Sequence, residues 1–173
     1  PGSASCRRDR PTPRRPSSPA ARDAGGALSL RAWESAFASW REILGERLYD
    51  LAYPDWRRSQ AAEVRGACEK HPATTVVAER DGRVVGFATT VLGEPAPEGA
   101  RTADLEIIAV DPDVQGDGIG RRLVDAALSL MRDAGCAYAN VWTGGDPGHG
   151  VARALYESSG FTALPVVHYY REL

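Results

Sequence analysis

The sequence predicts one mixed α/β domain, in which a central sheet of antiparallel and parallel strands is covered by helices on both faces. Three observations support this fold class. An amphipathic helical pattern opens the apolar part of the chain, a two-residue turn joins two apolar runs near its middle, and a glycine-rich loop links an apolar strand to another amphipathic helix. The 173 residues suffice for one such domain with its own core.

Residues 1–26 are predicted to form an Arg- and Pro-rich tail ahead of a domain over 27–173. The tail holds five of the twelve prolines and no apolar periodicity, so it buries too little apolar surface to become ordered. Pro1-Gly2-Ser3 is typical of what remains of a cleaved expression tag. The first 22 residues carry six Arg and one Asp, which leaves 15 basic and 22 acidic side chains for the remaining 151. An acidic body argues against a nucleic-acid partner; the acidity suits a cationic partner such as an amine, or serves solubility alone.

Two helices precede the strands. Apolar residues recur every three or four positions from Leu30 to Leu44, which predicts an amphipathic helix over 28–44 that ends at Gly45. A second helix is predicted over 56–70. Upstream of both, three prolines within residues 12–19 make a poor strand. The first strand of the sheet is therefore expected to be absent or reduced to a degenerate edge segment.

The strands begin with a hairpin. Asp81-Gly82 separates apolar runs over 75–80 and 83–90, and this turn dipeptide is the strongest short signal of a hairpin. A third strand is expected over 103–110. Its last four residues are apolar on both faces, so it is placed in the interior of the sheet.

The second half of the chain alternates helices and strands. The pattern predicts a helix over 118–134, a strand over 138–143, a loop over 144–150, a helix over 151–159, and a terminal strand pair over 161–163 and 166–171 that is interrupted at Pro165.

Composition also limits the location and the metal content. No apolar run approaches the roughly 18 residues of a membrane-spanning helix, and the first 25 residues lack the apolar segment of a signal peptide. Cys6, Cys68 and Cys136 are odd in number and far apart, which argues against a disulfide framework and a zinc site. We therefore expect a cytoplasmic protein without a metal.

The most informative segment is the glycine-rich loop over 111–120. Three glycines there allow a ligand to approach the backbone, and the unpaired N–H groups at the start of the next helix favour an anion such as a pyrophosphate. A P-loop is excluded because Lys70 is the only lysine and lies far away. A dinucleotide-binding Rossmann site is disfavoured because the loop lacks the G-x-G-x-x-G spacing.

Two motifs in this order resemble the GNAT superfamily of acetyl-CoA-dependent N-acyltransferases. The first follows a strand ending in Val110-Asp111-Pro112 and reads Gln115-Gly116-Asp117-Gly118-Ile119-Gly120. The second matches the family pattern A-x-x-L-Y-x-x-x-G-F with Ala152, Leu155, Tyr156, Gly160 and Phe161. The resemblance covers residues 28–173 and implies a GNAT-like fold.

The resemblance implies an acetyl-CoA site. Main-chain groups of Ile108, Ala109 and Val110 would pair with the pantetheine arm as an added strand does. A backbone N–H of the same stretch would serve as the oxyanion donor. The pyrophosphate would be held by Gln115, Gly116, Asp117, Gly118, Ile119 and Gly120 with the amide of Arg121, while Ala152 and Tyr156 would contact the cofactor from the last helix.

The resemblance also suggests catalytic residues. Tyr156 would protonate the departing thiolate. A base must deprotonate the amine, since an alkyl ammonium has a pKa of about 10.4. Glu106 is the first candidate and Asp104 the second; the two share a face if the strand is regular. His149 occupies a position where the family commonly has Asn, and Asp146 could orient its imidazole. A capping or loop role for His149 is equally open.

These residues lead to a function. The expected activity is direct transfer of an acetyl group from acetyl-CoA to a primary amine of a small molecule. The alternatives are acetylation of protein lysines or N-termini, and a non-catalytic acyl-CoA-binding regulatory module. No membrane partner is expected, and a homodimer is left open. Aromatic and acidic residues of the helical region are candidates for the acceptor pocket: Trp33, Phe37, Trp40, Tyr49, Tyr53 and Trp56, with Glu42, Glu46 or Asp50.

Overall fold

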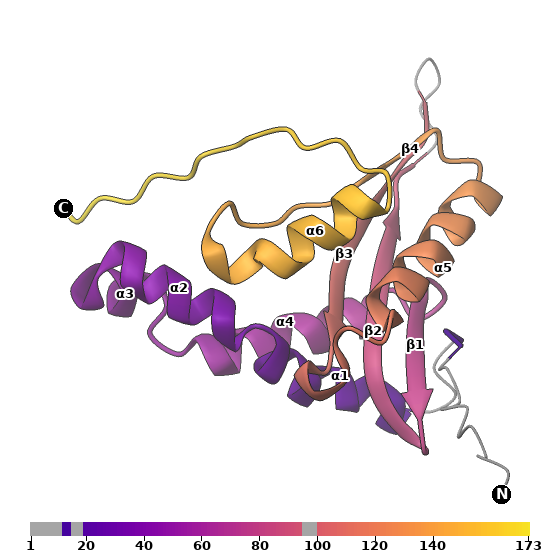
Figure 1. Ribbon diagram of the computed structural model, residues 1–173, viewed down its shortest axis with the longest axis horizontal. Coiled ribbons are helices and arrows are strands. Elements are labelled where there is room, and N and C mark those ends of the chain that lie inside the picture. The colour runs from indigo at the N-terminus through magenta and orange to yellow at the C-terminus, as the bar shows by residue number, and fades with distance from the viewer. Residues whose placement is uncertain (1–11, 15–18, 95–99) are drawn as a thin grey trace, which may run out of the picture.

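The computed structural model describes residues 12–14, 19–94 and 100–173. These residues form a four-stranded sheet between two layers of helices (Figure 1). The elements follow one another as α1 (Pro19–Ala32), α2 (Glu34–Leu44), α3 (Glu46–Ala52), α4 (Trp56–Lys70), β1 (Thr75–Arg80), β2 (Arg83–Leu92), β3 (Thr102–Val110), η1 (Pro112–Val114), α5 (Ile119–Asp133), β4 (Tyr138–Asn140), η2 (Pro147–His149) and α6 (Gly150–Ser158).

The sheet is mixed, as predicted. Its strands lie in the order β1-β2-β3-β4; β2 is antiparallel to both β1 and β3, and β4 runs parallel to β3. The predicted hairpin is confirmed, with positive φ angles of 51° at Asp81 and 74° at Gly82 in the turn between β1 and β2. The interior place of β3 is also confirmed.

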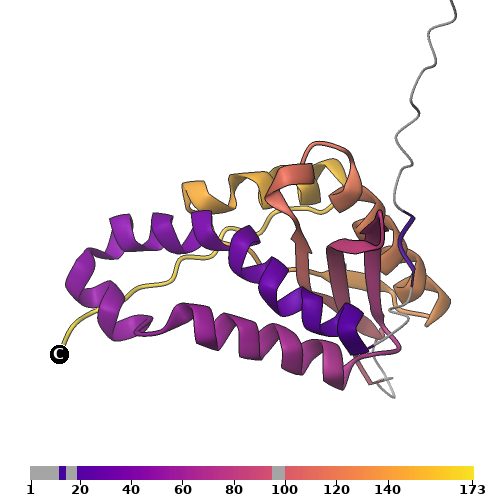
Figure 2. The ribbon, with the colours of Figure 1, turned by 90° about the horizontal axis from the view of Figure 1, so that it is seen from below.

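Different helices cover the two faces of the sheet. In Figure 2, α1 and α4 lie side by side across one face, where Leu28 and Val64 pack with Phe87 and Ile107. On the other face, α5 contributes the largest share of the core, and Tyr156 of α6 joins it. The fully buried residues of α5 are Ile119, Leu123, Val124 and Ala127.

The helical region differs from its prediction in two ways. The single helix expected over 28–44 is divided at Trp33, and its first half begins earlier, at Pro19. Apolar residues keep their helical spacing on both sides of Trp33 because α1 and α2 each turn one face toward the rest of the protein. The predicted stop is confirmed, since α2 ends at Leu44 and Gly45 adopts a φ of 74°. The short helix α3 after it was not anticipated.

An irregularity in β3 decides where its side chains point. Thr89 of β2 pairs with Ile107 whereas Thr90 pairs with Leu105, so Glu106 is an extra, unpaired residue of a β-bulge. As a result Leu105 belongs to the core beside α5, while Ile107 belongs to the core beside α1 and α4. The strand is not regular, so the condition under which Asp104 and Glu106 would share a face is not met.

The predicted terminal strand pair is absent: residues 161–173 contain no strand. Residues 162–173 are exposed and extend past α6 to α3, as the yellow trace in Figure 1 shows. There the hydroxyl of Tyr170 lies 2.6 Å from that of Tyr53, and Arg47 Nε donates to Glu172 at 2.7 Å. The physical reason is the shortness of β4, whose three residues offer little edge for another strand.

The first strand of the sheet is reduced to a single bridge in the described residues. Arg14 and Val77 exchange two main-chain hydrogen bonds, of 2.9 and 2.7 Å. This is the degenerate edge segment expected as one of two alternatives from the proline-rich sequence.

Candidate active-site cleft

A cleft of about 370 Å³ opens between β3, the start of α5 and the start of α6. It exists because β3 and β4 separate. The two strands pair only between residues 102–104 and 138–140, and the chain then moves away toward Trp142 and Thr143, which line the opposite wall. From Leu105 to Val110 the edge of β3 that faces the cleft has no neighbouring strand in the described part of the chain, so its main-chain groups are available to an extended ligand.

The glycine-rich loop forms one end of this cleft. Gly116 and Gly118 have φ angles of +88° and +73°, which side-chain-bearing residues rarely adopt. Gly118 is the N-cap of α5 and no side chain caps the helix, so the N–H groups of the first turn remain available to a ligand. The predicted residues that line the cleft are Gln115, Gly116, Gly118, Ile119, Gly120 and Arg121; Asp117 does not.

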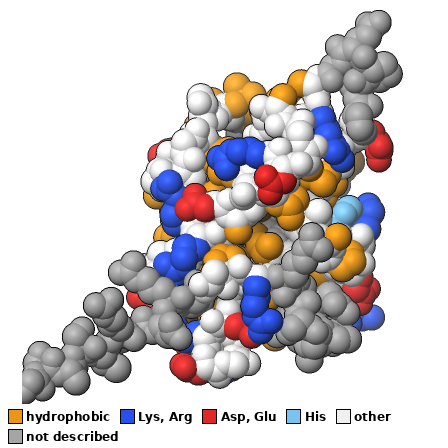
Figure 3. Space-filling view, turned by 90° about the vertical axis from the view of Figure 1, so that its right-hand side faces the viewer, with side chains coloured by type: hydrophobic (Ala, Val, Ile, Leu, Met, Phe, Trp, Pro, Cys, Tyr) orange, Lys and Arg blue, Asp and Glu red, His pale blue; other side chains and the backbone are white. Residues whose placement is uncertain are grey.

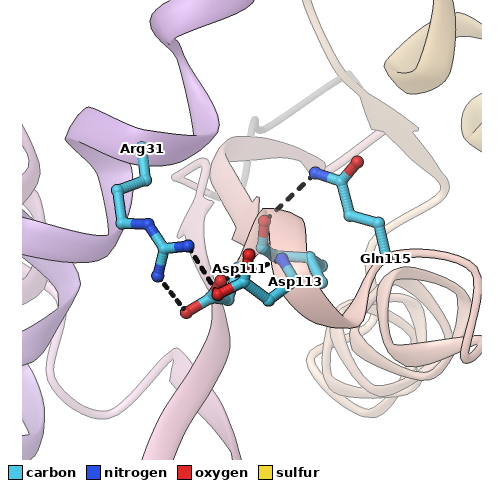
Figure 4. A network of polar contacts seen from close by, with 5 residues as sticks. Arg31, Asp111, Asp113 and Gln115 are labelled. Carbon is cyan, nitrogen blue, oxygen red and sulfur yellow. Dashed lines mark hydrogen bonds and ion pairs between the residues drawn. The ribbon is translucent and has the colours of Figure 1, made fainter.

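A network of polar contacts fixes the strand-to-loop junction (Figure 4). Arg31 of α1 donates to Asp111 at 2.9 Å and to Asp113 at 2.7 Å, and Asp111 also accepts from the main-chain N–H of Asp113. The side chain of Gln115 donates to the carbonyl of Val110 at 3.2 Å. Arg31 was missed by the sequence analysis because it lies 80 residues from Asp111.

The predicted main-chain stretch is in place. Ile108, Ala109 and Val110 all line the cleft. The carbonyl of Val110 already accepts a hydrogen bond from the Gln115 side chain, and its second lone pair can accept another from a ligand.

Tyr156 and Ala152 of α6 line the other end of the cleft. Tyr156 is 8% exposed as a residue, and its ring meets that of Phe161 edge-on. Burial raises the pKa of Tyr156 to about 12, so its hydroxyl remains protonated at neutral pH.

The three candidate bases lie in different surroundings. Glu106 is exposed and lines the cleft. Asp104 does not line it, and one of its carboxylate oxygens accepts a hydrogen bond of 2.8 Å from Asn140 of β4. His149 lines the cleft, with a side chain that is 13% exposed.

The imidazole of His149 is held by Asp146, which the sequence suggested as its partner, and by Trp40, which the sequence did not. Its Nδ1 lies 2.6 Å from Asp146 Oδ1, which also accepts a hydrogen bond of 3.1 Å from the indole of Trp40, and the Trp40 ring stacks on the imidazole. Burial raises the pKa of Asp146, but hydrogen bonds from His149, Trp40 and Ser39 outweigh it, so this pKa lies below the usual range of a carboxyl. The loop fits tightly against α2, since a Cβ on Gly148 would lie 2.5 Å from the carbonyl of Ser35.

The aromatic residues proposed for an acceptor pocket mostly pack on one another. Of the six, Trp33 lines the cleft. Phe37 stacks on Trp56 with ring centroids 4.1 Å apart, and Tyr53 stacks on Trp40. The acidic candidates Glu46 and Asp50 both pair with Arg41, which reduces their attraction for a cation.

The described residues contain no group of three or more His, Cys, Asp or Glu side chains placed to hold a metal ion. Cys68 and Cys136, the two described cysteines, are not joined in a disulfide and lie outside the cleft. No helix in this part of the chain is both long enough and apolar enough to span a membrane.

Comparison with known proteins identifies the family. The profile of the acetyltransferase (GNAT) family matches residues 33–161. The chain belongs to the GNAT acetyltransferase family.

The chain is 33% identical over 140 residues to a mycothiol acetyltransferase of Cellulomonas flavigena, covering 75% of this chain and 39% of that protein. A mycothiol acetyltransferase of Thermomonospora curvata is 39% identical over 95 residues, covering 55% of this chain and 30% of that protein. The chain thus spans less than half the length of these curated relatives.

Solved structures agree with the GNAT fold. A proposed acetyltransferase of the GNAT family from Desulfovibrio desulfuricans superposes with a TM-score of 0.60 at 26% identity, covering 90% of this chain and 87% of that one. The aminoglycoside N-acetyltransferase AAC(6′)-Iy in complex with CoA superposes with a TM-score of 0.52 at 20% identity, covering 80% and 90% of the two chains.

Proposed function

We propose that this GNAT domain transfers an acetyl group from acetyl-CoA directly to a primary amine of a small molecule. The observation that carries the proposal is the continuity of one cleft, which joins the uncapped start of α5 to the unpaired edge of β3 and to Tyr156. The names of the relatives, mycothiol and aminoglycoside acetyltransferases, support a small-molecule acceptor. Acetylation of proteins remains the second candidate.

The residues of the cleft fit CoA. The left-handed glycines and the free N–H groups of α5 suit the pyrophosphate, with Gln115, Ile119, Gly120 and the Arg121 amide around it, and Asp117 offering its main chain. Main-chain groups of Ile108, Ala109 and Val110 suit the amides of the pantetheine arm, and Ala152 leaves room beside it. Acetyl-CoA supplies the thioester that an amine attacks.

Tyr156 is proposed to stabilise the leaving thiolate. A phenol with a pKa of about 12 does not transfer its proton completely to a thiolate whose conjugate acid has a pKa of about 8.5. The Tyr156 hydroxyl nevertheless donates a hydrogen bond to the sulfur of CoA as negative charge develops on that atom. A protonated, buried donor suits this role.

Two side chains are proposed as acceptors of the amine proton, Glu106 and His149. Glu106 is supported by its position on the bulge at the unpaired edge of β3. His149 is supported by its pairing with Asp146, which places the proton on Nδ1 and leaves Nε2 as the acceptor. Asp104 is the weaker candidate because it lies outside the cleft.

The proposal is tested by measuring thiol release from acetyl-CoA in the presence of a panel of amines. The panel contains small amines, aminoglycosides, polyamines and lysine peptides. Turnover with a small amine supports the proposal, and turnover confined to peptides supports the second candidate. CoA binding without turnover on any amine supports the non-catalytic alternative and contradicts both.

A further inference from the structure

We infer that Arg80, at the end of β1, is a positioning residue for the pyrophosphate of CoA. Its NH1 lies 2.9 Å from Asp117 Oδ2, and this ion pair turns a carboxylate of the glycine-rich loop away from the anion site and cancels its charge. The inference rests on the proposed CoA site and adds a residue that lies 37 positions before Asp117 in the sequence.

Asp117 presents an electrostatic problem for an anion site. It lies between Gly116 and Gly118, where the main chain is best placed to approach a pyrophosphate. A free carboxylate at this point would repel the ligand, and the repulsion would be strong beside a partly desolvated cleft. In the structure the residues on either side of Asp117 line the cleft while Asp117 itself does not, because its side chain extends toward β1.

The stability of the hairpin does not account for an arginine at position 80. Arg80 is paired in register with Arg83, and like charges opposite one another destabilise a β-ladder. In addition, Arg80 Nε is buried without a hydrogen-bond partner, which also costs stability. An arginine kept under these two penalties points to a role outside the hairpin, and its one described ion pair is with the loop.

The other charged groups around the loop are consistent with this role. Arg122 donates to the main-chain carbonyl of Asp117 at 3.2 Å and helps to fix the turn. Arg31, from the opposite side, pairs with Asp111 and Asp113 (Figure 4). The acidic side chains of this loop thus form ion pairs with arginines of α1 and β1. The N–H groups of α5 can then attract an anion without repulsion from these carboxylates.

A double-mutant cycle tests the inference. Arg80→Met, Asp117→Asn and the double variant are compared with wild type by calorimetry of CoA and of 3′-dephospho-CoA. We expect Arg80→Met to weaken both ligands roughly tenfold, and Asp117→Asn to restore affinity in that background to within about threefold of wild type. Arg47→Met is the matched control, because it removes an equal charge from an exposed pair with Glu172 and should leave affinity unchanged.

Other outcomes overturn the inference. Equal losses in Arg80→Met and the double variant would mean that Arg80 does not act through Asp117, and a loss seen with CoA alone would assign Arg80 to the 3′-phosphate. If Arg80→Met does not fold, Asp117→Asn alone carries the test: it should bind CoA as well as wild type or better, and weaker binding contradicts the proposal. A wild-type protein that binds no CoA would instead refute the proposed function.

Discussion

The hydroxyl of Tyr156 stays protonated throughout the pH range in which free amines become available. Its raised pKa has a single cause, burial between the sheet and Phe161. The same burial that disfavours the phenolate makes the neutral hydroxyl a fixed donor at the end of the cleft. The contribution of Tyr156 is therefore expected in the transition state, where the thiolate forms, and not in the binding of CoA.

Replacing Tyr156 by Phe removes only this donor. We expect kcat to fall by about 30- to 300-fold, in the range of one lost transition-state hydrogen bond, while CoA affinity stays within about twofold. Steady-state thiol release and calorimetry measure the two quantities. A variant that turns over as fast as wild type on every amine would remove Tyr156 from the reaction.

The raised pKa of Tyr156 also predicts a loss of stability in alkali. Because the folded state raises this pKa from 10.0 to about 12, the contribution is fully present below pH 10 and is lost as the pH rises toward 12. The loss is on the order of 2 kcal/mol. Urea unfolding at pH 9 and pH 11.5 should show a smaller decline for Tyr156→Phe than for wild type. Tyr138→Phe, at an exposed tyrosine, should decline as wild type does.

The base can be assigned by comparing variants of the two candidates. If His149 accepts the proton, His149→Gln lowers kcat about a hundredfold. Glu106→Gln should then retain most of the activity. Asp146→Asn, which disturbs the hydrogen bond that holds His149 Nδ1, should lower kcat with CoA affinity unchanged. The reverse pattern, with Glu106→Gln inactive and His149→Gln active, would assign the base to Glu106.

At the level of elements, the start of α5 shows one residue type serving both the folding of a helix and the proposed binding of CoA. Gly118 is both the left-handed N-cap of the helix and part of the cleft wall. Gly118→Asp adds a strained side chain and a negative charge there, and we expect CoA binding to be lost. Gly66→Asp adds the same charge on an open surface of α4 and should bind CoA normally. Unchanged affinity in Gly118→Asp would place the pyrophosphate elsewhere.

Elements with a strong local signal were predictable. The Asp81-Gly82 turn, the glycine-rich loop and the stop at Gly45 each depend on backbone angles that few residues allow, so the sequence alone identifies them. The bulge at Glu106 has no such signal. It arises from the pairing of β3 with β2, and only the register shows that Leu105 and Ile107 enter different cores.

At the scale of the whole molecule, the cleft is assembled from segments that no local pattern connects. Arg31, Arg80 and Trp40 reach the loops of the site from α1, β1 and α2, and their partners are 37 to 106 residues away in the sequence. The charges are dispersed as well: on the face in Figure 3, acidic and basic side chains lie next to one another among the coloured residues. The main-chain stretches that line the cleft could be named from the sequence, while the ion pairs that neutralise its acidic side chains required the tertiary structure.

Also at the scale of the whole molecule, the sequence-based prediction and the structure differ in the C-terminal segment, and an experiment can distinguish them. If residues 161–163 and 166–171 formed strands of the sheet, deleting 162–173 would remove part of the core and unfold the domain. In the structure these residues are exposed, and their hydrogen bond to Tyr53 and ion pair with Arg47 are surface contacts that contribute little. We therefore expect the deletion to lower the melting temperature by less than about 4 °C. Tyr53→Phe, which removes only the Tyr170 contact, is the control and should lie between the deletion and wild type in calorimetry. A deletion variant that fails to fold would show that the segment belongs to the sheet.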